Sequence, residues 1–189
     1  MMKPLAHTYR RRLHEEAVGN YGYVTTATAR ELGIPGIELV KLHRRGGLTR
    51  VGHGVYRFDD IPQTDQGAYM EAVLMAGPDA VLIGDAVLSL LDLGLANPRR
   101  IRIATPRRVQ RTLPTRLDVK QMRIGLEDLT AIEGIPATTL RRAIRDCRGT
   151  IMDERLLDAV REGRRRGLLT RGDATALEAE LGALPGVTE

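Results

Sequence analysis

Residues 41–58 read KLHRRGGLTRVGHGVYRF, and this stretch decides how the N-terminal part of the chain folds. Two short β-prone runs, LTRV and GVYRF, flank the tripeptide Gly-His-Gly at 52–54. Glycines at such a point supply the positive φ angles that a tight hairpin turn needs. Because Gly46 and Gly47 separate the first run from a helical pattern before it, the stretch predicts the end of a helix followed by a β-hairpin.

Two short helices are predicted upstream of this stretch. Residues 6–18 have apolar side chains at four-residue spacing, which is typical of a helix with one buried face. Its inward positions are Tyr9, Leu13 and Ala17. Residues 27–32 form the second predicted helix, with Thr25 or Thr26 as its N-cap and Gly33 as its C-terminal stop.

A third helix is predicted over residues 35–45, where Pro35 suits the first turn and Leu39 and Leu42 share an inward face. Its outward face presents Gly36, Ile37, Val40, Lys41 and Arg44. Three short helices followed by a hairpin predict a winged helix-turn-helix. In that fold the third helix enters the major groove of DNA, and the hairpin wing lies along the backbone or in the adjacent minor groove.

The basic residues of these elements are predicted to contact duplex DNA, because residues 41–58 hold five Lys or Arg, two His and no acid. The predicted DNA-contacting residues are Thr26, Arg30, Lys41, Arg44, Arg45, Arg50, His53 and Arg57. The alternating apolar pattern predicts that four residues pack on the buried face of the hairpin: Leu48, Val51, Val55 and Phe58. Lys41 and Arg44 are expected to read base edges, whereas Arg50 and Arg57 are expected to contact phosphates. An alternative for the two arginines that end the helix is that the macrodipole alone favours them, by ~0.3–1 kcal/mol each.

The composition is that of a globular protein for which nucleic acid is the first partner to consider. The chain has 189 residues, of which 42% are hydrophobic and 28% charged, with a net charge of +5 and a pI of about 9.8. With 3% aromatic residues and no Trp, it has little to stack on unpaired bases, which favours a duplex over a single strand. Residues 1–16 are too charged for a secretory signal, and no uncharged apolar run approaches the ~18 residues that span a bilayer. We therefore expect a cytoplasmic protein with no membrane partner.

A segment rich in acids and turn residues, DDIPQTDQG at 59–67, is predicted to link two domains, residues 1–62 and residues 63–189. The second domain mixes predicted helices at 68–77, 85–95, 138–147, 152–167 and 170–182 with predicted strands at 99–105 and 115–124. Residues 130–140 carry a Gly-Ile-Pro turn, and whether it joins two short strands is left open. Asp153 and Thr170 are the predicted N-caps of the last two helices. The predicted fold class is thus mixed α/β (α+β), with an N-terminal winged helix-turn-helix followed by a mixed domain.

Patterns of a catalytic site are mostly absent from the sequence. The only serine, Ser89, lies in an apolar helical run, and the four histidines lack metal-ligand spacing. We therefore expect no catalytic residue, no metal, no cofactor and no enzymatic activity. One alternative remains, because Asp79 followed by Asp118 and Lys120 imitates the acids and lysine of a metal-dependent nuclease. The plainer interpretation is a capping Asp79 and an amphipathic strand, since a whole apolar helix separates the two acids.

Four motifs, taken in their order along the chain, resemble those of the AbiEi-type antitoxins of bacterial toxin–antitoxin operons. They are TARELGIP…LVKLHRRGGLTRVGHGVYRF, DAVLIGDAVLSLLDLGL, EGIPATTLRRAIRDC and ERLLDAVREGRRRGLLT. The chain departs from the family pattern at Leu140, where members commonly have a proline after the paired threonines.

The resemblance implies a winged helix that binds inverted repeats in its own promoter and represses the operon. It also implies a C-terminal domain that neutralises a nucleotidyltransferase-like toxin, either by direct binding or without a tight complex. The residues themselves also allow a transcriptional regulator whose second domain senses a ligand or a protein.

Six arginines of the second domain cluster near its predicted strands: Arg99, Arg100, Arg102, Arg107, Arg108 and Arg111. Three interpretations stay open for them, namely a wider DNA footprint, an acidic toxin as partner, and a solvated surface.

Overall fold

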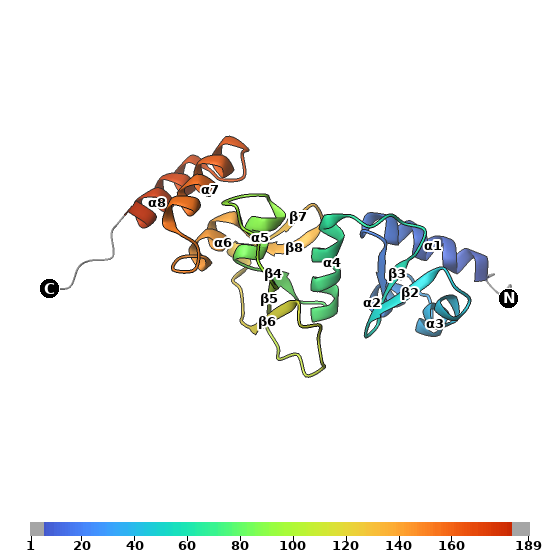
Figure 1. The fold of residues 1–189 in the computed structure, drawn as a ribbon. Coiled ribbons are helices and arrows are strands. Elements are labelled where there is room, and N and C mark those ends of the chain that lie inside the picture. Colours follow the sequence, from blue (N-terminus) through green and yellow to red (C-terminus); the bar gives the residue numbers. More distant parts are fainter. Residues whose placement is uncertain (1–5, 183–189) are drawn as a thin grey trace. The chain divides into compact units, whose positions relative to one another are not determined.

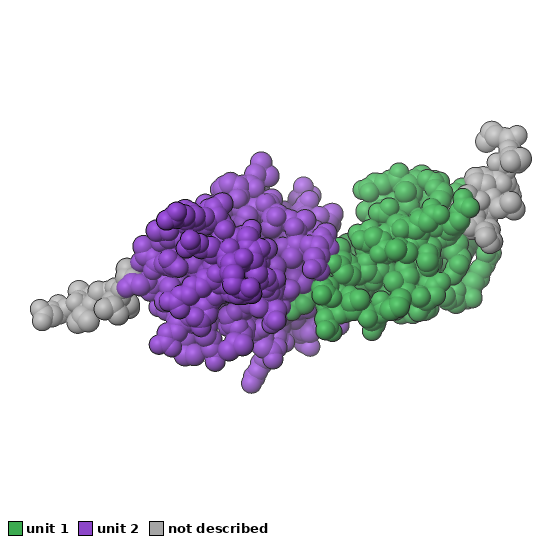
Figure 2. All heavy atoms as spheres, turned by 90° about the horizontal axis from the view of Figure 1, so that it is seen from above, with its two compact units in different colours: residues 1–75 green, residues 76–189 purple. Residues whose placement is uncertain are grey.

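The computed structural model describes residues 6–182, and for residues 6–8 it describes the backbone alone. The chain divides into two compact units between Met75 and Ala76 (Figure 2). The predicted boundary after residue 62 lies before this division, and the elements that follow explain the difference. Within residues 6–182 no helix is long and apolar enough to cross a membrane.

The first unit has the element order of a winged helix-turn-helix (Figure 1). Its elements are α1 (Ala6–Gly19), β1 (Tyr23–Thr25), α2 (Thr26–Glu31), α3 (Gly36–Arg44), β2 (Leu48–Gly52), β3 (Val55–Phe58) and α4 (Asp65–Ala76). The strands form an antiparallel sheet in the order β1-β3-β2. The three predicted helices and the predicted hairpin are confirmed. Strand β1 was not predicted, because three residues are too few to show an alternating pattern.

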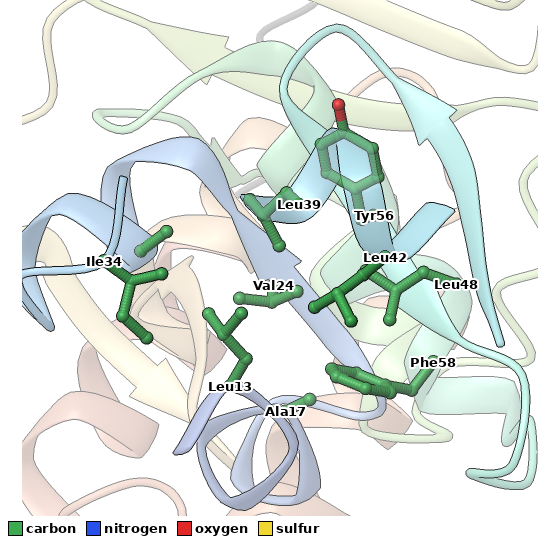
Figure 3. Close-up of a cluster of buried hydrophobic side chains, with 10 residues drawn as sticks. Leu13, Ala17, Val24, Ile34, Leu39, Leu42, Leu48, Tyr56 and Phe58 are labelled. Atoms are coloured by element: carbon green, nitrogen blue, oxygen red, sulfur yellow. The ribbon is translucent and has the colours of Figure 1, made fainter. Parts of the chain in front are cut away.

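The core of the first unit is made by the predicted inward residues. Leu13 and Ala17 of α1 are fully buried, as are Leu39 of α3 and Phe58 of β3. These side chains gather with Val24 and others in one cluster (Figure 3). Each short element contributes only one or two apolar side chains, so the helices and the sheet depend on one another for burial.

Helix α4 begins inside the segment predicted as a linker. Thr64 Oγ1 accepts a hydrogen bond of 3.1 Å from the Gly67 backbone N–H, which satisfies one donor of the first turn. Tyr23 of β1 donates its hydroxyl to Glu71 Oε2 at 2.7 Å. Helix α4 is therefore joined to the sheet of the winged helix, and the first unit extends beyond residue 62.

The second unit is built on a five-stranded sheet in the order β6-β5-β4-β8-β7. Its strands are β4 (Val81–Leu82), β5 (Ile101–Thr105), β6 (Leu117–Gln121), β7 (Leu129–Ile132) and β8 (Ile135–Thr138). The pairs β4–β8 and β5–β6 are parallel, whereas β4–β5 and β7–β8 are antiparallel. Its helices are α5 (Asp85–Leu90), a 3₁₀ turn η1 (Leu126–Asp128), α6 (Leu140–Asp146), α7 (Asp153–Arg165) and α8 (Arg171–Gly182). The mixed α/β fold class is confirmed.

Three local features of the second unit differ from the sequence-based expectations. The turn between β7 and β8 is formed by Glu133 and Gly134, with φ angles of 50° and 82°, so the following Ile-Pro pair lies in β8. The N-cap of α7 is Met152, and Asp153 lies in the first turn. Strand β4 was not predicted because it has only two residues. Thr170 does cap α8, since its Oγ1 accepts from the Asp173 backbone N–H at 3.1 Å.

Candidate nucleic-acid interface

Helices α2 and α3 are held at a fixed angle by a short turn between them. Thr25 caps α2, because its Oγ1 accepts from the Thr28 backbone N–H at 3.0 Å. Gly33 takes a φ of 68°, which ends the helix, and the next residue, Ile34, is 1% exposed in the core. This turn fixes the direction from which α3 presents its outer face.

The outer face of α3 carries exposed bases and one exposed apolar side chain. Ile37, near the start of the helix, is 55% exposed, and Lys41 and Arg44 lie further along. Lys41 Nζ donates to Glu38 Oε1 at 2.7 Å, with half of the lysine side chain exposed. The pair is only partly exposed, because 16% of the Glu38 side chain is accessible.

The wing is the hairpin of β2 and β3, and its tip is tied to the start of α2. The register between the strands shifts from Arg50 to Gly52, and the turn has Gly54 at a φ of 70°. The Thr26 backbone N–H donates to Gly54 O at 2.9 Å. A Cβ at Gly54 would approach Thr26 Oγ1 to 2.8 Å, so only glycine allows this close contact. Of the two glycines predicted to supply the turn, only Gly54 has a positive φ.

Arg50 and His53 of the wing are exposed, as predicted. Arg50 Nε donates to Gly52 O at 3.2 Å, which leaves the terminal nitrogens of the guanidinium directed away from that bond. His53 lies in the hairpin turn itself. Both side chains lie on the exposed surface of the wing, the element that in winged helix-turn-helix proteins lies along the DNA backbone.

Arg57 contradicts the prediction that it would be available to phosphates. Its side chain is buried, with 9% of the residue exposed, and its Nη2 donates to Ile61 O. The reason is that β3 is the central strand, paired with both β1 and β2, and all four of its residues are buried. In a two-stranded wing every second residue would be exposed. Here Arg57 is covered by strand β1, which was not predicted, and by residues 59–61. Arg57 therefore holds the segment after β3 in place.

The three arginines of α1 differ from the bases of α3 and the wing because they have partners. Arg10 pairs with Asp60 at 3.2 Å, Arg11 lies 3.6 Å from Glu15, and Arg12 donates to the Leu32 carbonyl at 2.7 Å. By contrast, among the residues that the structure describes, no ion pair is formed by Arg30, Arg44, Arg45 or Arg50. Arg30, Arg44, Arg45 and Arg50 thus lie on α2, α3 and the wing without an acidic partner in the described structure, whereas of the three α1 arginines only Arg12 lacks one.

The residues of the alternative nuclease site do not form the expected cluster. Asp118 lies on the edge strand β6, where its Oδ2 is 3.9 Å from Arg102 Nε of β5. Arg102 also approaches Asp85, whose pKa is raised by burial although the guanidinium opposes the shift. Asp79 precedes β4, on the other side of β5 from Asp118. Residues 6–182 contain no group of three His, Cys, Asp or Glu side chains placed to hold a metal ion.

Comparison with known proteins finds a family model that matches the winged helix. Residues 11–58 match the family model described as "Transcriptional regulator, AbiEi antitoxin". The match runs from α1 to the end of β3, which are the elements that carry the uncompensated bases. It confirms the resemblance to AbiEi-type antitoxins over this region and supports a role as an antitoxin or transcriptional regulator. No curated protein matches the chain.

Proposed function

We propose that the protein is the antitoxin of a bacterial toxin–antitoxin pair and that it represses its own operon by binding promoter DNA in the cytoplasm. The observation that carries this proposal is a coincidence of two features in one segment. The residues that match an antitoxin and regulator family also hold the exposed bases that have no acidic partner within the described structure.

The proposed DNA complex places α3 in the major groove. Arg44 is the preferred base-reading residue, because it is exposed and has no ion pair in the described structure, and a guanidinium can bind guanine O6 and N7 together. Lys41 is the second, once it exchanges Glu38 for DNA. The exposed Ile37 offers an apolar contact to a thymine methyl group.

The remaining bases are proposed to bind phosphates. Arg50 and His53 lie on the wing, and Arg45 ends α3. Arg30 is exposed in the last turn of α2, the helix that crosses the backbone in this fold. Thr26 is half-buried under the wing tip, so its role in this complex is to hold the wing through its bond to Gly54. Arg57 is not part of the proposed interface.

The antitoxin role rests on the motifs after residue 58 and assigns neutralisation of a nucleotidyltransferase-like toxin to the second unit. The alternative is a regulator whose second unit senses a ligand or a protein. The neighbouring gene separates the two, because an adjacent nucleotidyltransferase-like reading frame is expected only for the antitoxin.

One double variant tests both parts of the proposal. In Lys41→Ala/Arg44→Ala, the sequence-specific gel shift of the upstream promoter is expected to disappear, because both base-reading side chains are lost. Growth rescue on co-expression with the adjacent toxin is expected to persist, since α3 is not assigned to neutralisation.

The matched control is Arg11→Ala, which removes an exposed base from α1 of the same unit. It is expected to leave the promoter shift intact. Retention of specific binding by the double variant would refute the assignment of α3 to the major groove. Loss of growth rescue in the double variant would refute the division of roles between the units.

A further inference from the structure

Strand β7 forms one edge of the five-stranded sheet, and its only neighbour is β8. A tight turn joins these strands, so the residues that flank the turn, Ile132 and Ile135, are a hydrogen-bonded pair. In an antiparallel ladder such pairs alternate with pairs that exchange no hydrogen bond. By this alternation Leu129 and Ala131 belong to the second kind. Their backbone N–H and C=O groups therefore point away from β8, toward the open edge of the sheet.

Two further observations fit this assignment. The residue opposite Ala131 is Pro136, which has no N–H and could not donate to β7. Before the strand, Asp128 O accepts a hydrogen bond of 2.8 Å from the Thr139 backbone N–H, in the register that the alternation requires. In the described structure the outward groups of Leu129 and Ala131 have no backbone partner. The edge of β7 thus offers both donors and acceptors to an added strand.

The two edges of the sheet differ in how they are protected. Edge strands usually resist pairing through charged side chains, a proline or a bulge. The opposite edge strand, β6, carries Asp118 and Lys120. Strand β7 reads Leu-Thr-Ala-Ile, without a charge, a proline or a register shift, and its first three residues are exposed. Of the two edges, β7 is therefore the one suited to pair with a further strand.

An apolar groove of about 390 Å³ lies against the same edge. Leu129 lines it together with Met122, Ile124 and Pro136, of which the first two belong to the segment that leaves β6. Leu129 is 36% exposed, and Leu126, three residues earlier, is 86% exposed. A strand added at β7 would direct alternate side chains toward this groove. Backbone pairing would supply affinity, and the groove would select apolar side chains.

The surroundings of β7 are acidic, although the whole chain has a net charge of +5. Residues 124–140 hold three acids and no Lys, Arg or His. Asp128 is buried and paired with two arginines of α6, at 3.0 and 3.4 Å, so its charge is compensated. Glu127 and Glu133 lie at the two ends of the strand and are exposed. The complementary strand is therefore apolar at alternate positions and basic near its ends, and a polyanion is disfavoured at this edge.

A second copy of the chain is a poor occupant of this edge. If two β7 strands paired through their outward groups, Leu129 of one copy would lie opposite Ala131 of the other. The same register would bring Glu127 of one copy toward Glu133 of the other, at both ends of the pair. Like charges placed opposite each other destabilise a strand pair.

We propose that the outer edge of β7 binds an extended strand of the cognate toxin, which lengthens the sheet of the second unit. This inference rests on the proposed function and deepens it, because it names the surface that holds the toxin and makes neutralisation a direct contact. The toxin strand has apolar side chains that enter the groove beside Leu129 and a basic side chain that meets Glu127.

The test uses the full chain and the purified product of the adjacent reading frame. Ala131→Pro removes only an outward donor, because the N–H of Ala131 makes no bond to β8. It is expected to weaken toxin binding in biolayer interferometry at least about tenfold and to abolish growth rescue on co-expression, since a toxin carbonyl loses its partner. Ala131→Val keeps the N–H and is the matched control, with an expected change of less than about threefold. In the wild-type complex, hydrogen exchange at the Leu129 and Ala131 amides is expected to slow.

Two further variants decide the question if the proline disturbs the fold. Leu129→Lys places a charge at the groove and is expected to weaken toxin binding at least about tenfold. Its control is Leu95→Lys, at an exposed leucine outside β7 and the groove, which is expected to change binding by less than about twofold. Glu127→Gln is expected to weaken binding by about two- to fivefold and to flatten its salt dependence, as loss of an exposed ion pair does.

The outcomes separate this proposal from the proposed function. Failure of the wild-type protein to rescue growth refutes the antitoxin role, and the toxin contact with it. Growth rescue without a detectable complex, or with equal binding by Ala131→Pro and Ala131→Val, overturns the β7 site and leaves the antitoxin role intact. The promoter gel shift is expected to persist in every β7 variant. If Ala131→Pro loses that shift, it has lost its fold, and an equal effect of Leu129→Lys and Leu95→Lys on toxin binding then overturns the β7 site.

Discussion

At the scale of single residues, Arg50 and Arg57 lie on paired strands of the wing and have opposite environments. Arg50 is exposed, whereas Arg57 is buried and donates to the Ile61 carbonyl. Within the described structure the buried Nε of Arg57 has no hydrogen-bond partner, so Arg57 is held by its packing and by its hydrogen bond to Ile61. The proposed function therefore assigns Arg50 to DNA binding, whereas the burial of Arg57 assigns it to stability.

We predict that Arg57→Ala lowers the free energy of unfolding by about 1–3 kcal/mol, because it removes a buried hydrogen bond and the packing of a long side chain. Arg50→Ala is expected to stay within about 0.5 kcal/mol of the wild type. In DNA binding the order reverses, with Arg50→Ala reducing the salt slope by about one and Arg57→Ala leaving it unchanged. Urea unfolding and anisotropy titrations measure the two quantities. An equal slope change for both variants would contradict the burial of Arg57.

At the scale of elements, the second unit joins α6 to α8 through a bidentate ion pair. Arg145 donates from Nε and Nη2 to the two carboxylate oxygens of Glu180 at 2.9 and 2.6 Å. Its hydrogen bonds hold the pKa of Glu180 below the ordinary value of 4.5. A group whose pKa is lower in the folded state contributes stability above its unfolded pKa, and that contribution is lost as the pH falls through the folded pKa.

We therefore predict that Glu180→Gln lowers the melting temperature at pH 7 by about 1–3 °C, as expected for a partly exposed ion pair. The difference from the wild type is expected to shrink below pH 4.5 and to vanish once Glu180 is protonated. Glu178→Gln is the matched control on α8, because Glu178 forms no ion pair with the described residues. Thermal melts between pH 3 and pH 7 test this, and a difference that persists at pH 3 would exclude the ion pair as its cause.

Elements with a clear period were predictable from the sequence, whereas the short strands β1 and β4 were not. The four-residue spacing of Leu13 and Ala17 and the glycines after α3 located the helices of the winged fold. Strands β1 and β4 have three and two residues, so only their partners in space reveal them. Because β1 was not predicted, Arg57 was expected to be exposed on the wing, whereas it is buried.

At the scale of the whole molecule, the extent of the first unit is a testable property. Composition placed the boundary after residue 62, because the acids and turn residues of 59–67 look like a linker. In the structure the Tyr23 hydroxyl donates to Glu71 of α4, and Met75 packs so closely to Gly52 that an added Cβ would lie 3.2 Å from its Cγ. Helix α4 thus contacts both β1 and the wing, and the winged helix depends on it.

We predict that a fragment of residues 1–76 has a larger free energy of unfolding than a fragment of residues 1–62, by about 1–3 kcal/mol. Tyr23→Phe identifies the cause. In the longer fragment it removes the hydrogen bond to Glu71 and is expected to cost about 1 kcal/mol, because the carboxylate loses a partner. In the shorter fragment the carboxylate is absent, so the same change is expected to have little effect.

Urea unfolding of the four proteins gives the coupling between Tyr23 and α4 as the difference of the two Tyr23→Phe effects. A coupling near zero, together with equal stability of the two fragments, would return the boundary to residue 62. A coupling of about 1 kcal/mol would make α4 an integral helix of the winged-helix unit. In that case a change in α4 alters the stability of the wing through Tyr23 and Gly52, without a contact to DNA.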